Sequence, residues 1–232
     1  MICGGYCGFP VWSSDGREIY YASNGKGPYD IYVKPADESG PERPLVTFDG
    51  AQFGAAFLTA SPDGKYLAFN SWDSTNPTMH IYTVALAGDH KPQLFHQSSA
   101  NESAPAFSPD GNWLAYESNQ GGRDEVYITP FPAGGAQYQV STRGGERPVW
   151  RHDGKVIYYR EALTMMAVKV NTQKNTASLG TPTALFDVAA RNLNGRWFDV
   201  SPDGRFLMNT SPPAAQPQNF ELVVNWPADL NQ

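Results

Sequence analysis

An Asp-Gly dipeptide that lies between two short apolar runs and is followed by a basic or polar residue occurs five times in this chain. Asp-Gly in this setting is a strong β-hairpin signal, because Gly adopts the positive φ that a tight turn needs. Each copy therefore predicts a hairpin. The copies are WSSDGREIYYAS at 12–23, SPDGKYLAFN at 61–70, FSPDGNWLAYES at 107–118, WRHDGKVIYYRE at 150–161 and VSPDGRFLMNTS at 200–211.

The five turn aspartates, numbered 15, 63, 110, 153 and 203, are 48, 47, 43 and 50 residues apart. A period of this size is typical of repeat architectures. After each Asp-Gly turn an apolar residue recurs with period two, so one face of each second strand needs cover from a neighbouring sheet. The pattern predicts an all-β propeller of four-stranded blades, with approximate bounds 8–47, 48–97, 98–143, 144–190 and 191–226.

The fourth and fifth predicted blades differ in their outer strands. In the fourth blade we expect strands over 148–151, 156–160, 165–170 and 183–187, the last being the outer strand. In the fifth blade we expect strands over 197–201, 206–210 and 221–225, so that its outer strand is missing. Leu207 is predicted to share the covered apolar position of Ile19, Leu67, Leu114 and Ile157.

Composition narrows the classes of partner. The formal charge is −6 and no Lys/Arg-rich run occurs, so nucleic acid is an unfavourable partner. No run reaches the roughly 18 apolar residues of a membrane helix, and the N-terminus lacks the pattern of a signal peptide. We expect Cys3 and Cys7 to be free thiols in a frayed terminus rather than a disulfide or half of a metal site. The turn aspartates are read as backbone-turn residues rather than calcium ligands.

The repeat SPDG, followed by a basic or polar residue and an aliphatic-aromatic strand, resembles the TolB-type β-propeller repeat. Segments such as GPYDIYVKPADESG at 27–40 and GGERPVWRHDGKVIYY at 144–159 are similar to the propellers of bacterial serine/threonine protein kinases. The resemblance implies a binding or sensing propeller without chemistry of its own, usually with six or more blades. It also implies a periplasmic or extracytoplasmic location. With five units, this chain would be a fragment or a shortened relative.

Catalytic signatures are absent from the sequence. There is no Gly-x-Ser-x-Gly elbow and no set of protein-kinase motifs. A metal-dependent lyase would need convergent ligands, but His80, His90, His96 and His152 fall in places that should diverge. We therefore expect no catalytic residue, no metal and no cofactor. The alternative is a propeller-type hydrolase or metal-dependent lyase with a channel site.

Binding is then predicted at the channel mouth, formed by the loops that enter the inner strands and the loops that join second to third strands. Its ligand would be a protein, a peptide or a small molecule. Trp72, in a polar loop, would be either an aromatic anchor for this ligand or a side chain packed on a neighbouring blade. The predicted ligand-binding residues are Trp72, Asp73, Asn101, Glu102, Arg123, Glu146, Arg147 and Arg196.

Closure of the ring is the last expectation from the sequence. A fifth blade without an outer strand leaves an open edge, unless the N-terminus or another chain supplies a strand. We expect either an open five-blade arc or an arc that lacks upstream blades, and in both cases a chain that self-associates or aggregates more than a closed propeller would. Pairing of residues 1–5 with 221–225 would instead close a five-bladed ring.

Overall fold

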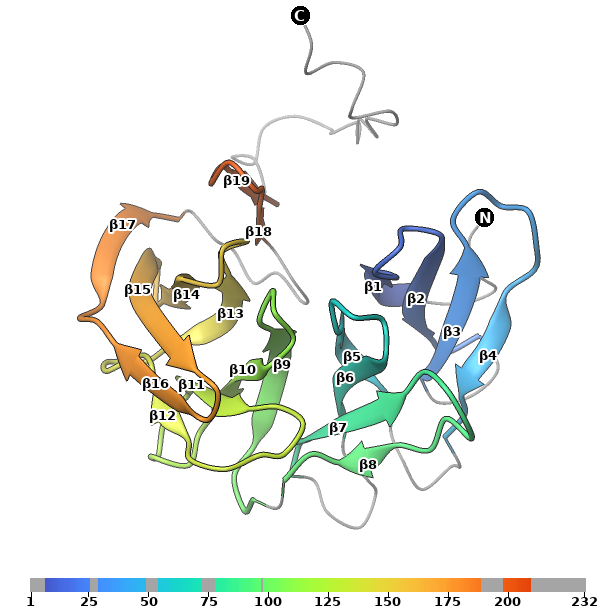
Figure 1. The fold of residues 1–232 in the computed structure, drawn as a ribbon, viewed down its shortest axis with the longest axis horizontal. Coiled ribbons are helices and arrows are strands. Elements are labelled where there is room, and N and C mark those ends of the chain that lie inside the picture. The colour runs from blue at the N-terminus through green and yellow to red at the C-terminus, as the bar shows by residue number, and fades with distance from the viewer. Residues whose placement is uncertain are drawn as a thin grey trace, which may run out of the picture.

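A computed structural model describes residues 7–25, 29–48, 54–71, 78–96, 98–188 and 198–209 of the chain. Every regular element in these ranges is a β-strand, and none of the described residues forms a helix long and apolar enough to cross a membrane. Four antiparallel sheets and a final hairpin follow one another along an open arc (Figure 1). The all-β propeller architecture expected from the sequence is confirmed, as sheets that do not close into a ring.

Each of the first three sheets contains four strands in chain order. The first sheet comprises β1 (Cys7–Trp12), β2 (Glu18–Ser23), β3 (Asp30–Pro35) and β4 (Arg43–Val46). The second comprises β5 (Ala56–Ala60), β6 (Tyr66–Ser71), β7 (His80–Ala85) and β8 (Gln93–Leu94). The third comprises β9 (Glu102–Phe107), β10 (Trp113–Ser118), β11 (Glu125–Pro130) and β12 (Tyr138–Gln139). The strands β1, β5 and β9 are the inner strands of the arc.

The fourth sheet differs from the prediction at its outer edge. It contains β13 (Glu146–Trp150), β14 (Val156–Glu161), β15 (Thr164–Gln173), β16 (Thr176–Leu179) and β17 (Thr183–Asp187). The third strand is ten residues long and turns directly into β16, a strand that the sequence analysis missed. Strands β16 and β17 pair with successive halves of β15. Two short strands therefore share the outer position that 183–187 was expected to fill alone.

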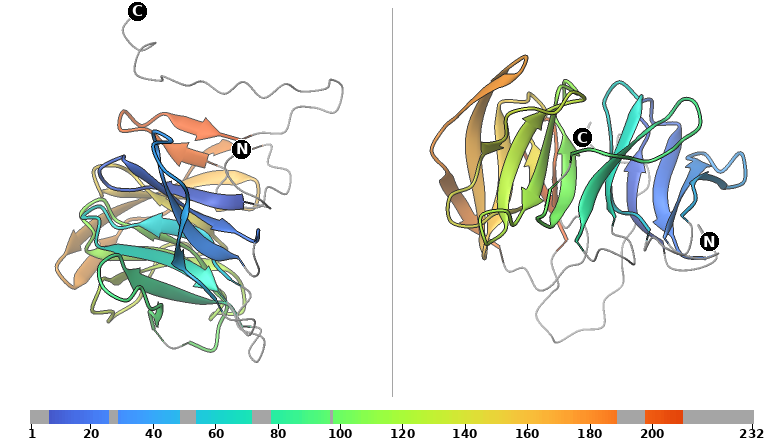
Figure 2. Two further views of the ribbon diagram at one scale, coloured as in Figure 1. Left: turned by 90° about the vertical axis from the view of Figure 1, so that its right-hand side faces the viewer. Right: turned by 90° about the horizontal axis from the view of Figure 1, so that it is seen from below.

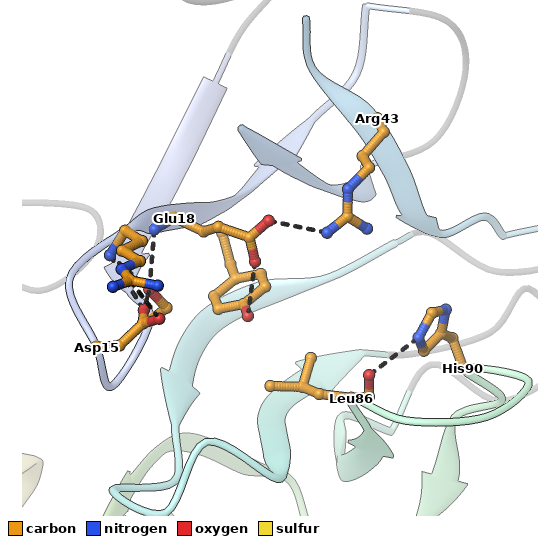
Figure 3. A network of polar contacts seen from close by, with 8 residues as sticks. Asp15, Glu18, Arg43, Leu86 and His90 are labelled. Carbon is orange, nitrogen blue, oxygen red and sulfur yellow. Dashed lines mark hydrogen bonds and ion pairs between the residues drawn. The ribbon is translucent and has the colours of Figure 1, made fainter. Parts of the chain in front are cut away.

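The Asp-Gly turns are held by a repeated side-chain network. Ser61 Oγ donates to Asp63 Oδ1 at 2.7 Å and accepts the backbone N–H groups of Lys65 and Tyr66 at 3.2 and 2.9 Å. Figure 3 shows the equivalent turn at Asp15, beside the ion pair of Glu18 and Arg43 on the same sheet. The five turn glycines have φ between +70° and +84°. The predicted hairpins are therefore present with the expected turn chemistry.

We expect Ser61→Ala to raise the pKa of Asp63 from about 2 toward its ordinary value, because the Ser61 hydroxyl is the largest cause of the lowering. The lost hydrogen bonds should cost about 1 kcal/mol of stability. Because the folded-state pKa of Asp63 is below the unfolded one, its contribution is full above about pH 4 and disappears as pH falls through about 2. Asp153, whose pKa is held at about 2 by Arg151, is an internal control in the same carboxyl NMR titration. An unchanged Asp63 titration would contradict this assignment.

The hydrophobic core lies between consecutive sheets rather than at the axis. Figure 2 shows the sheets standing side by side, and each junction contains its own apolar cluster. Between the first two sheets, buried Ile31 and Phe69 belong to one such cluster. Within each of the first three sheets, a stacked aromatic pair joins the second and third strands, with centroids about 6 Å apart. The period-two apolar pattern is thus explained by face-to-face packing.

Cys7, at the start of β1, is disulfide-bonded. The expectation of a free thiol in a frayed terminus was wrong at this position, because Cys7 is the first residue of β1 and belongs to the first sheet. Cys3 lies outside the described residues.

The last hairpin pairs β18 (Phe198–Val200) with β19 (Phe206–Met208), and its connection is one residue shorter than that of the other four inner hairpins. The first four inner hairpins close with a bond spanning five residues, such as Ser61 N–H to the carbonyl of Tyr66, whereas here Ser201 N–H bonds Arg205. A one-residue change of register moves side chains to the opposite face. Leu207, predicted to be covered, is 71% exposed, and Phe206 packs against Tyr158 instead.

We expect Leu207→Ala to change the free energy of unfolding by less than about 0.5 kcal/mol, because an exposed side chain loses little on truncation. The matched variant Leu114→Ala removes a fully buried side chain at the same repeat position and should cost about 2–5 kcal/mol. Urea denaturation of both variants measures the difference. A similar loss at both positions would mean that Leu207 is covered in solution.

The two ends of the arc carry exposed apolar side chains, Trp12 in β1 and Leu207 in β19. No strand pairing links β1 to β19 in the part of the chain that is described. Residues 1–5 and 221–225 lie outside that part. Self-association through the open edge stays a prediction, to be checked by sedimentation analysis.

Candidate functional site

Each of the four inner strands contains a β-bulge at the same place. The bulged residues are Phe9, Phe57, Ala104 and Arg147, with φ of 54°, 51°, 50° and 57°. Positive φ is uncommon for residues other than glycine, and the other described cases fall in turns or loops. Bulges redirect side chains and are frequent next to functional sites. We call these four residues the bulge cluster.

The bulge cluster brings side chains from three sheets into contact. The rings of Phe9 and Phe57 have centroids 4.8 Å apart, and Cζ of Arg147 lies 3.9 Å from the centroid of Phe57. The intervening inner strand carries only the small Ala104 at this position. The small methyl group leaves room for the guanidinium of the fourth sheet to reach the aromatic ring of the second. This stacking is a favourable cation–π arrangement.

A buried carboxylate fixes the direction of Arg147. Glu117, at the end of β10, accepts the backbone N–H of Arg147, and its Oε1 is 3.6 Å from Nε of the same residue. Its other oxygen accepts the Ser103 hydroxyl at 2.7 Å. Burial raises the pKa of Glu117, and Arg147 and Ser103 act in the opposite direction. Both carboxylate oxygens of Glu117 therefore have donors.

Arg147 itself retains donor capacity. Burial lowers the pKa of its guanidinium, while Glu117 and Glu146 raise it. Its Nη1 is buried and has no hydrogen-bond partner among the described residues. A guanidinium has five N–H donors, and a buried donor without a partner is costly. The bulge cluster thus contains an oriented donor next to two aromatic rings.

Further charged groups surround Arg147. Arg160 forms an ion pair with Glu146. Burial raises the pKa of Asp124, and the neighbouring Glu146 raises it further. The sequence analysis predicted Glu146 and Arg147, and the structure brings them into this group. It missed Arg160, Glu117 and Asp124, which come from β14, from β10 and from the loop after β10.

Three other predicted residues join neighbouring strands and loops. Asn101 Oδ1 accepts the Met79 backbone N–H at 2.9 Å, and its own N–H donates to Asn119 Oδ1 at 2.9 Å. Glu102 is buried and pairs with His96 at 2.7 Å. Arg123 contacts Glu125 Oε1 and the Thr142 carbonyl, both at 2.6 Å. Trp72, Asp73 and Arg196 lie outside the described residues.

A sequence signal for the bulges exists but is indirect. Pro10, Pro105 and Pro148 each stand five residues before the Asp of their turn, with Leu58 in the equivalent place. A residue before proline normally favours extended backbone, so the motif did not suggest positive φ. Only strand pairing shows that the preceding residue is bulged.

A cavity of about 290 Å³ lies at the other end of the inner strands, next to the Asp-Gly turns. This location differs from the predicted mouth. His152 belongs to this cavity. His90 lies elsewhere, and its Nε2 donates to the Leu86 carbonyl at 3.2 Å (Figure 3). Among the described residues, no group of three or more His, Cys, Asp or Glu side chains could hold a metal ion. The cavity is lined by Thr59, Pro62, Ala106, Phe107, Pro109, Val149, Trp150, His152, Asp199 and Val200.

Comparison with known proteins places this geometry in a family. A tricorn protease homologue of Streptomyces coelicolor is 30% identical over 147 residues, which cover 56% of this chain and 13% of the relative. TolB from Acinetobacter baumannii has a similar structure, with a TM-score of 0.61 and 22% identity, covering 87% of this chain and 53% of TolB. An oligogalacturonate lyase from Vibrio parahaemolyticus has a TM-score of 0.61 and 15% identity, covering 84% of this chain and 56% of the lyase.

The chain spans only about half the length of these two solved structures, which fits a partial propeller. At these identities, the two structures show the fold alone. The family described as the TolB beta propeller domain matches residues 8–187, most of the chain. The repeated Asp-Gly hairpins, the four-stranded sheets and this match agree, and the chain belongs to the TolB β-propeller family.

Proposed function

We propose that this chain is a non-catalytic binding module that recognises a protein, a peptide or a small ligand at the channel mouth. The observation that carries the proposal is the bulge cluster, in which Phe9, Phe57 and Arg147 come together from three of the four equivalent bulged strands. Positive φ at a residue other than glycine costs about 1–3 kcal/mol, and such strain gathers at functional sites. Four strained positions in register therefore support a role beyond stability.

The setting is a larger bacterial signalling or envelope protein outside the cytoplasm. Membership of the TolB family and the resemblance to kinase-linked propellers support this part of the proposal. The disulfide at Cys7 agrees with it, because disulfides persist mainly in oxidising compartments. The hydrolase or lyase alternative needs a nucleophile with its base, or a metal set, at the channel.

The proposal is tested by screening the chain with a random-peptide display library and a fragment library, followed by NMR mapping of the hits. We expect the shifted backbone signals to gather around Ser103 and Arg147. Ala104→Phe should block binding, because it fills the small position with the residue already present at the equivalent bulges in β1 and β5. Arg43→Ala, on the outer strand β4, is the matched control and should bind as the parent does.

Thermal unfolding of Ala104→Phe must show a folded protein for the comparison to count. Hits confined to the outer strands β4, β8 and β12 would overturn the proposal. Turnover of peptide or polygalacturonate substrates by the purified chain would overturn its non-catalytic part.

A further inference from the structure

Arg147 has an unused donor beside apolar surface. Its Nη1 is buried without a partner in the described part of the chain, and its guanidinium lies 3.9 Å over the ring of Phe57. Stacking restricts the orientation of a guanidinium, so little further entropy is lost when it binds an acceptor. Glu117 is not the acceptor for Nη1, because its Oε2 accepts the Ser103 hydroxyl, and its Oε1 accepts the backbone N–H of Arg147 and lies 3.6 Å from Nε. The site therefore lacks one oxygen acceptor.

The charge around Arg147 decides which kind of acceptor fits. Its electrostatic neighbours are Glu117, Glu146, Asp124 and Arg160. Two guanidiniums facing three carboxylates leave a net charge of minus one. Burial raises the pKa of Glu117 and of Asp124, and Glu146 raises both further, so these two carboxylates already experience the repulsion of a third. A fourth carboxylate would add to this repulsion, whereas a neutral carbonyl would not.

We propose that the bulge cluster binds an uncharged peptide carbonyl, with Arg147 donating to the oxygen and Phe9 and Phe57 contacting an apolar side chain of the same ligand. This inference rests on the proposed function and narrows its ligand to a neutral, apolar peptide segment. The aromatic pair supplies the apolar contact. The surrounding carboxylates disfavour an acidic ligand at the same place.

The test compares two probes that differ only at one end, N-acetyl-phenylalanine N-methylamide and N-acetyl-phenylalanine. We expect the neutral amide to bind about tenfold more tightly than the carboxylate, measured by NMR titration of the Arg147 Nε–Hε signal and the two Phe rings. The difference should shrink as salt is added, because ionic strength screens the repulsion. Equal or tighter binding of the carboxylate would overturn the inference.

Variants separate ligand binding from a purely structural role of Arg147. Arg147→Lys keeps a cation beside Glu117 but loses the planar fork, and it should weaken amide binding about tenfold. Phe57→Leu keeps Arg147 but removes the ring, and it should weaken binding several-fold. Arg43→Lys, far along the outer strand β4, is the control and should bind as the parent does.

Each outcome is decisive. Unchanged amide affinity in Arg147→Lys, with the variant folded, would show that Arg147 serves only Glu117. No shift of the Arg147 signal at saturating probe would overturn the inference in the same way. If library hits still map to the mouth while the two probes bind alike, the binding function stands and the carbonyl assignment fails. If hits map elsewhere, the proposed function itself fails.

Discussion

Gly54→Ala is expected to destabilise the fold by about 3 kcal/mol or more, the upper end of single-residue effects. Gly54 has φ of +92°, and a Cβ there would lie 2.4 Å from the backbone N and 2.5 Å from the carbonyl oxygen of Tyr29. These backbone atoms also form the bridge between the first and second sheets, where Ala55 N–H donates to the Tyr29 carbonyl at 2.8 Å. The Cβ cannot be accommodated without separating the two sheets.

Gly88→Ala provides the matched control for this prediction. Gly88 has a similar φ of +98°, but a Cβ there meets open space. We expect Gly88→Ala to lower the free energy of unfolding by only about 1–2 kcal/mol, which is the cost of left-handed backbone strain. Urea denaturation followed by circular dichroism gives both values. Equal losses in the two variants would show that strain, and not the contact with Tyr29, decides the effect.

Arg147→Met should cost about 3–5 kcal/mol near neutral pH, because it leaves the buried Glu117 without its ionic partner. The double variant Arg147→Met/Glu117→Gln should recover part of this loss, since no unpaired charge is then buried. Arg43→Met is the control, because its ion pair with Glu18 is largely exposed and should contribute less than about 1 kcal/mol. Chemical denaturation measures the free energy of unfolding of all three variants.

The pH dependence of Arg147→Met provides an independent check. Burial already raises the folded-state pKa of Glu117, and loss of Arg147 should raise it further. A carboxyl with a raised folded pKa costs stability as pH rises above its unfolded value of about 4, since the unfolded chain releases the proton first. The deficit of the variant should therefore shrink as pH falls from 7 toward 4. A deficit that does not vary with pH would mean that Glu117 is not the affected group.

The repeat could be predicted from the sequence because the interactions that form each turn are local. A turn such as Ser61–Gly64 is formed by hydrogen bonds between residues at most five apart, so the sequence contains all of its parts. The second strands follow each turn directly and have clear period-two patterns. The second strands expected over 156–160 and 206–210 are found at Val156–Glu161 and Phe206–Met208. The propeller architecture followed from the regular recurrence of such strands.

The departures arise where strand partners are far apart in the sequence. Strand β16 pairs with residues 170–173 of β15, which extend beyond the part of β15 that pairs with β14. Nothing in 165–170 alone predicted this extension. Leu207 has the same spacing from its Asp-Gly turn as the covered residues of the other hairpins. The connection of the last hairpin is one residue shorter, which shifts the strand register and places Leu207 on the exposed face.

The sequence by itself determined the hairpins, the repeat and the family, because these depend on turn chemistry and on apolar periodicity within short segments. It also led to the prediction of Arg147 and Glu146 as ligand-binding residues of the channel mouth. Only the tertiary structure decided that Arg147 stacks on Phe57 and pairs with Glu117, because those residues come from three different sheets. Their contact depends on bulges in the inner strands, and a bulge is defined by pairing between strands, which no single segment contains.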